Sequence, residues 1–150
     1  MKLNTKSLKE IERGFPVLAE QVLFAELNAE IKPKKNGDGQ NLEVNCRVLN
    51  EEVLKKDGST LNNDKGKLTF KYFVSLVPTA QYDPDKSLAM IADAIKLPED
   101  ADLDIDDIQG KYVKIKLGIQ PARDGRDEQN NVRALLPIKD TDDFTPPAVA

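Results

Sequence analysis

The sequence predicts a mainly β domain of five strands, with one helix between the third strand and the fourth. Apolar and polar residues alternate over five separate stretches, which is the period of a strand that buries one face. Asn-Gly and Asp-Gly pairs, which favour tight turns, separate the first two of these stretches and the last two. The alternation gives way to helical spacing between residues 83 and 97.

The first three strands are expected over residues 21–31, 42–48 and 68–76. The first strand carries apolar residues on both faces near its start, which predicts that both faces are covered there. Residues 32–40 join the first two strands in a turn that is basic at its centre. Residues 50–67 are polar and hold four lysines, so we expect a long mobile connection to the third strand.

The inserted helix and the last two strands complete the predicted domain. Asp83 suits the N-cap of the helix, and Pro84 suits its first turn. An acidic stretch follows, and one further helical turn is expected over residues 105–109. The fourth and fifth strands are expected over residues 111–119 and 132–138, on either side of a basic, polar turn.

Five strands with a helix between the third and the fourth is the arrangement of the OB-fold, a small Greek-key barrel. An antiparallel β-sandwich would show the same local patterns and is the alternative. In the barrel interpretation, residues 1–14 are an N-terminal helical segment, and residues 15–139 form the OB-like domain, including a helical acidic insertion at residues 81–110. Residues 140–150 are acidic and contain two prolines, which predicts a disordered tail.

The composition excludes several classes of catalytic site. The chain has no histidine, which excludes a Ser-His or Cys-His relay and a histidine-based zinc site. Its single cysteine, Cys46, falls on the apolar face of a strand, where we expect a small buried hydrophobe. A nuclease built from carboxylates and a metal is the remaining enzyme class, but no paired spacing supports it. We therefore expect a protein that is not an enzyme and that uses no cofactor or metal.

The sequence shows neither a membrane span nor a secretion signal. No apolar run approaches the roughly 18 residues that a spanning helix needs. The first residues do not resemble a signal peptide, because polar and charged residues follow Leu3 directly. We therefore expect a cytoplasmic protein that makes no contact with a membrane. The sequence leaves open whether it is a monomer or a homo-oligomer.

The distribution of charge and of aromatic rings indicates a nucleic-acid-binding surface. The formal net charge is −4, yet residues 111–139 carry seven basic and three acidic side chains, whereas residues 81–110 carry two basic and nine acidic ones. OB-folds bind oligonucleotides with their second and third strands and with the loops joining strands one to two and four to five. The candidate contacts with the nucleic-acid backbone are Lys34, Lys35, Arg123 and Arg126 in those loops and Lys71, Lys114 and Lys116 on strands.

Two rings are candidates for stacking on bases. Phe73 lies on the opposite face of its strand from Phe70 and Tyr72, beside Lys71, and Tyr112 also lies beside lysine. Exposed rings next to cations are how sequence-tolerant proteins bind single strands. The alternative for both rings is that they pack under another segment or another subunit.

The glycines and turns of the chain also resemble those of a group of bacteriophage proteins. The residues that carry the resemblance are the run from Ala29 through Asn36, Gly37, Asp38, Gly39 and Leu42, then Gly110-Lys111, Gly125 and Asn131-Val132. These features are similar to small phage proteins of the replication and recombination module, several of which are taken to be OB-fold single-stranded-DNA-binding proteins. The resemblance covers most of residues 20–138. It implies a protein that protects single strands or delivers them to replication or recombination enzymes in the cytoplasm of a bacterial host.

The acidic tail adds a candidate site for partner proteins. It is similar in character to the tails by which bacterial single-strand binders recruit phage or host replication and recombination proteins. The resemblance therefore implies that Asp142, Asp143 and Phe144 bind a partner. The tail departs from that pattern because six residues follow Phe144. A second hypothesis is a phage structural or anti-defence protein, which would bind another protein through the acidic stretch at residues 99–107.

Overall fold

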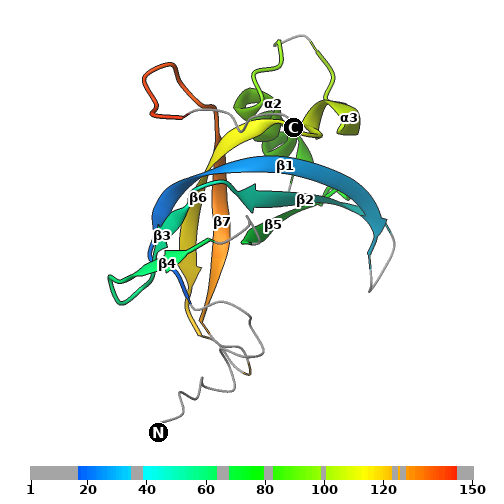
Figure 1. Ribbon diagram of the computed structural model, residues 1–150. Helices are drawn as coiled ribbons and strands as arrows, with labels where there is room; N and C mark the ends of the chain where they lie inside the picture. Colours follow the sequence, from blue (N-terminus) through cyan, green and yellow to red (C-terminus); the bar gives the residue numbers. More distant parts are fainter. Residues whose placement is uncertain are drawn as a thin grey trace, which may run out of the picture.

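The computed structural model describes residues 17–34, 39–63, 68–79, 83–98, 101–122, 125 and 128–144. A five-stranded antiparallel sheet, strongly curved, dominates this part of the chain (Figure 1). Its strands are β1 (Gln21–Pro33), β2 (Gln40–Val48), β5 (Thr69–Ser75), β6 (Tyr112–Gln120) and β7 (Gln129–Leu136). The remaining elements are the hairpin of β3 (Glu52–Leu54) and β4 (Thr60–Asn62) and the helices α2 (Pro84–Ala94) and α3 (Ile105–Ile108).

The sheet has the order β5-β2-β1-β6-β7, which confirms the prediction of a mainly β fold with five principal strands. The helix α2 stands between the third and fourth of these strands, as expected. The described strands do not form a closed barrel, because the edge strands β5 and β7 share no hydrogen-bonded ladder. These two strands nevertheless approach each other, with Cα atoms within 8 Å.

The core lies on one face of this sheet and follows the predicted alternation. Leu23, Ala25 and Leu27 of β1 are buried. Val22, which precedes them near the start of the strand and faces the other way, is 50% exposed. The pairing registers place Leu27 opposite Cys46 of β2 and Leu23 opposite Ile115 of β6, so inward residues of adjacent strands meet. Burial raises the pKa of the Cys46 thiol to about 12, and the cysteine is a buried hydrophobe as predicted.

The two helices close one end of the molecule (Figure 1). The Asp83 side chain accepts a hydrogen bond from the backbone N–H of Asp85 at 2.9 Å, which caps α2. Buried Ile91 joins α2 to the core, and the helix packs against β5 and β7. After α3, the Gln109 side chain accepts from the backbone N–H of Ala29 at 2.9 Å and donates to its carbonyl at 2.6 Å, which extends the hydrogen bonding of β1.

The structure corrects the expectation of a mobile connection for residues 50–63; residues 64–67 of that connection lie outside the described residues. Within it, β3 and β4 pair as a hairpin, and Val53 is buried. Asn63 then holds the chain in place: its side-chain nitrogen donates to the carbonyls of Val48 at 2.9 Å and Asn50 at 3.0 Å, and its oxygen accepts from Leu68 N at 3.1 Å. The hairpin was missed because strands of three residues are too short to show an alternating pattern.

Other differences from the expected elements are smaller. The last strand is β7 over Gln129–Leu136, shifted from the predicted residues 132–138. Its first residues are polar and pair with the end of β6, so the apolar pattern could not reveal them. The helix expected within residues 1–14 lies outside the described part of the chain.

A Gly39→Ala substitution is expected to lower the free energy of unfolding by about 2 kcal/mol, through backbone strain and overpacking together. Gly39 has φ of 110°, a conformation that favours glycine, and a Cβ atom there would overlap Cγ2 of Val77. Gly58→Ala is the matched control, because Gly58 has φ of 90° but nothing within 4 Å of a Cβ position. Urea unfolding should show the smaller loss for Gly58→Ala; equal losses would contradict the overlap with Val77.

Candidate nucleic-acid interface

The face of the sheet opposite the core, here called the outer face, carries most of the predicted strand residues of the site. The alternation along β5, β2, β1 and β6 directs their polar positions to this face. The cations on it are Lys32, Arg47, Lys71, Lys114 and Lys116, and the aromatic rings are Phe24, Phe73 and Tyr112. The outer face therefore brings together residues that are up to 84 positions apart in the sequence, between Lys32 and Lys116.

Phe73 stands exposed at one side of the outer face. Its side chain is on β5, opposite Glu43 of β2, and the residue is 57% exposed. Its strand neighbour Lys71 places Nζ 2.7 Å from Oε1 of Glu43, and Lys32 places Nζ 3.4 Å from the other carboxylate oxygen. The carboxylate, with a side chain only 7% exposed, thus holds two lysine ammonium groups near the exposed ring.

These ion pairs predict that Glu43 makes the fold sensitive to acid. The contact with Lys71, followed by that with Lys32, holds the pKa of Glu43 below its ordinary value. A carboxyl group whose pKa falls on folding stabilises the folded state above its unfolded pKa of about 4.3, and this contribution is lost as the pH falls through the folded value. Glu43→Gln should therefore lower the urea midpoint at neutral pH, and the difference from wild type should shrink below about pH 4.

Glu51→Gln is the control for that experiment, because Glu51 is exposed and forms no ion pair within the described chain. Its unfolding midpoint should follow that of the wild-type protein at every pH. A Glu43→Gln effect that stays constant from neutral to acidic pH would contradict a stabilising charge on Glu43.

The other side of the outer face is covered by the chain's own C-terminal segment. The ring of Phe144 stacks on Phe24, with centroids 4.8 Å apart and planes at 27°, and lies 5.7 Å from the ring of Tyr112. Asp142 places Oδ2 2.9 Å from Nζ of Lys114, whose side chain is 16% exposed. A hydrogen bond from the backbone N–H of Lys139, and then the contact with Lys114, lower the pKa of Asp142.

The predicted partner-binding residues therefore lie against predicted nucleic-acid-binding residues. Tyr112 is half-buried under Phe144, which is the alternative that the sequence left open for this ring. The expected coverage of the first strand on its second face is found at Phe24, which Phe144 covers, but not at Val22 on the same face, which is 50% exposed. The structure places residues 140–144, the start of the tail expected to be disordered, beside the sheet, and Asp143 among them is exposed.

Of the remaining predicted residues, Lys116 belongs to the outer face, and the loop residues are not gathered there. Lys34 is half-buried after β1, where its backbone N–H donates to the carbonyl of Gly39 at 3.1 Å. Lys116 is exposed on β6. Lys35, Arg123 and Arg126 lie outside the described residues. Sequence reasoning did not select Phe24, Glu43 or Arg47; their positions in the strand alternation placed them on the outer face, but only the pairing register shows their neighbours.

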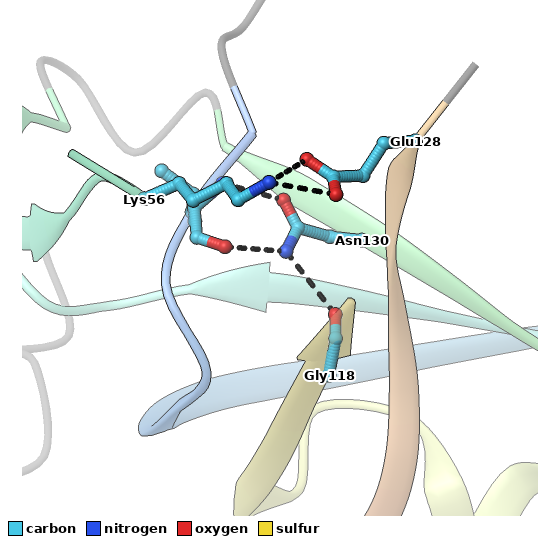
Figure 2. Close-up of polar contacts among 5 residues, drawn as sticks. Lys56, Gly118, Glu128 and Asn130 are labelled. Atoms are coloured by element: carbon cyan, nitrogen blue, oxygen red, sulfur yellow. Dashed lines mark hydrogen bonds and ion pairs between the residues drawn. The ribbon is translucent and has the colours of Figure 1, made fainter. Parts of the chain in front are cut away.

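The base of the connection between β6 and β7 is joined to the β3–β4 hairpin (Figure 2). Lys56, in the hairpin turn, places Nζ 2.6 and 2.7 Å from the two carboxylate oxygens of Glu128. The Asn130 side chain accepts from Leu18 N at 2.7 Å and donates to the carbonyls of Leu18 at 2.8 Å and Gly118 at 3.1 Å. The hairpin therefore contacts one end of the loop on which the sequence placed two candidate arginines, through Lys56 and Glu128.

The described residues contain few other features that restrict function. Within those ranges, no three His, Cys, Asp or Glu side chains are grouped so that they could hold a metal ion. None of the helices described is both long enough and apolar enough to cross a membrane.

No protein-family model matches the chain, and a search of curated proteins finds no significant match.

Proposed function

We propose that this chain is a non-enzymatic single-stranded-DNA-binding protein whose sheet is an open form of the OB barrel. In that barrel the first strand pairs with the second and the fourth, the third pairs with the second, and the fifth pairs with the fourth. Counting the strands of the large sheet in chain order, β1, β2, β5, β6 and β7 have this pairing. The approach of β5 to β7 corresponds to the incompletely closed side of such a barrel. A sandwich is less favoured, because the five strands share one sheet.

The observation that carries the proposal is the exposed ring of Phe73 beside Lys71. A large aromatic side chain that is 57% exposed leaves apolar surface in water, and a nucleic-acid base stacked on it would cover that surface. Phe73 lies on β5, and its opposite neighbour lies on β2. These are the second and third strands of the proposed barrel, which form the binding surface of OB-folds.

The charges of the outer face support binding of moderate strength. Several of its cations are paired: Lys71 and Lys32 with Glu43, and Arg47 with Glu26 at 3.2 Å. Lys116 forms no ion pair within the described chain and is exposed, so it can contact a phosphate directly. Each phosphate neutralised on a single strand contributes about −0.7 to the slope of log K against log salt. We therefore expect a shallow salt dependence, corresponding to a small number of phosphate contacts.

The proposed role is to protect single strands or deliver them to replication or recombination enzymes, as the phage resemblance implies. In this role the tail, with Asp142, Asp143 and Phe144, would be the segment that a phage or host partner recognises. The setting would be the cytoplasm of a bacterial host. Binding by several copies along one strand would suit either a monomer or a homo-oligomer.

Fluorescence anisotropy tests this function with a labelled oligothymidine titrated at about 20 mM and about 200 mM salt. Duplex DNA of the same length and oligouridine are compared with it. The expected result is tighter binding to the single-stranded oligothymidine than to the duplex, weakened by salt. No binding at the lower salt, or equal affinity for the duplex, would overturn the proposal. Tighter binding of oligouridine would identify RNA as the ligand and would overturn the assignment to DNA.

Lys116→Ala provides the charge-specific part of this test, with Lys86→Ala as its control. Lys86 is an exposed lysine on α2, away from the outer face. Lys116→Ala should weaken binding at low salt and make the salt slope shallower by about 0.7. The same effect from Lys86→Ala would indicate binding to the overall charge of the protein and contradict a site on the sheet.

A further inference from the structure

A groove of about 530 Å³ lies between α2 and the chain that follows this helix. Its apolar lining comes from Leu88 and Ala92 on α2 and from Leu97 and Leu103 beyond the helix, all of them half-buried. Buried Ile91, three residues after Leu88 on α2, packs into the core next to the groove. Leu88, Leu97 and Leu103 also pack against the edge of the core, so the groove exposes only the part of these side chains that the core does not cover.

Three carboxylates, those of Asp85, Asp93 and Asp102, line the same groove. None of them forms an ion pair within the part of the chain that the structure describes. Asp93 stands in the last turn of α2, which contains no basic residue. A negative charge there is unfavourable beside the partial negative charge of the helix C-terminus, so the charge of Asp93 does not stabilise α2.

We propose that this groove, here called the α2 groove, binds a short basic amphipathic segment of a partner protein. Leucine-like side chains of that segment would occupy the apolar lining between Leu88 and Leu103, and flanking lysines or arginines would meet the carboxylates. A cation near Asp93 would also offset the unfavourable charge at the helix end. Nucleic acid does not fit this chemistry, because its phosphates would face three aspartates.

The α2 groove is separate from the outer face of the sheet. α2 contacts β5 and β7 on the side of the core, whereas Phe73 and Lys116 point to the other face. A partner in the groove would therefore leave the outer face free for a single strand. The proposal thus goes beyond DNA binding: it assigns a second site that could bring another protein to the strand.

The test uses a fluorescein-labelled peptide of leucines and lysines, with leucines spaced three and four residues apart, titrated with the full chain. The triple variant Asp85→Asn/Asp93→Asn/Asp102→Asn should bind it about tenfold more weakly and with less salt dependence. Glu51→Gln/Glu52→Gln/Asp106→Asn is the matched control, because it removes the same charge from exposed residues that do not line the groove. This control should change the affinity less than twofold.

Ala89→Trp tests the apolar part without a change of charge, since Ala89 lines the groove but is exposed on α2. Ala89→Trp should weaken the binding of the peptide about fivefold or more. The circular dichroism spectrum of the protein should stay unchanged. Equal weakening by the two triple variants, or no effect of Ala89→Trp, would overturn the proposal. So would a dimer in sedimentation that the groove variants dissociate, because the occupant would then be a second copy. Oligothymidine binding should be the same in all variants, so failure here is distinguishable from failure of DNA binding.

Discussion

Replacing Phe73 with alanine is expected to weaken the binding of single-stranded DNA about tenfold to a hundredfold. Stacking of a base on an aromatic side chain contributes about 1–3 kcal/mol, and Phe73 is the large hydrophobic side chain with the greatest exposure among the described residues. The loss should appear equally at low and moderate salt, because the ring carries no charge. Anisotropy titration of labelled oligothymidine at two salt concentrations measures both quantities.

Two further variants separate stacking from simple loss of apolar area. Phe73→Trp keeps a flat ring and should retain at least the wild-type affinity. Val22→Ala also removes apolar surface, from a residue that is 50% exposed at the start of β1, but it removes no ring and should have little effect. Wild-type affinity in Phe73→Ala would remove this residue from the site and, with it, the observation on which the proposed function mainly depends.

The exposure of Phe73 could be predicted because the alternation of β5 is local. Phe70 and Tyr72 face the core with Val74, so the ring between them had to face outward. The same reasoning located the five long strands and α2, because the cap of α2 and its apolar spacing involve only residues close together in the sequence. Patterns of this kind need about five or more residues, which explains why the hairpin of β3 and β4 was not found.

The features that were not predicted depend on contacts between distant segments. Asn63 fixes the chain after the hairpin through three backbone groups, and an isolated asparagine gives no sign of such a role. Lys71 is paired with Glu43, 28 positions earlier in the sequence, because β2 and β5 are adjacent in this register. The coverage of Tyr112 by Phe144 joins residues that are 32 positions apart. Charge and periodicity could place these residues on a face, but could not show which charges are already neutralised.

The last of these contacts predicts that the tail competes with DNA. Phe144 covers the rings of Phe24 and Tyr112, on which a base could stack. Asp142 forms an ion pair with Lys114, which could otherwise bind a phosphate. When a site is open for only a fraction of the time, its apparent dissociation constant rises in inverse proportion to that fraction. An aromatic pair alone contributes about 0.5–1.5 kcal/mol beyond the area that it buries, enough to close the site for most of the time.

The double variant Asp142→Asn/Phe144→Ala should therefore bind oligothymidine about tenfold more tightly than the wild-type protein. The control Asp140→Asn/Asp143→Asn removes two tail charges from exposed residues and keeps both contacts with the sheet, so it should change the affinity much less. The pKa of Asp142 is lowered in the folded protein. The contribution of Asp142 to covering the outer face is therefore present above the ordinary aspartate pKa of about 3.9, and it is lost only as the pH falls through the lowered value. The difference between double variant and wild type should thus be constant from pH 6 to pH 8. Equal tightening by the control would show that general repulsion, and not occupation of the site by the tail, limits binding.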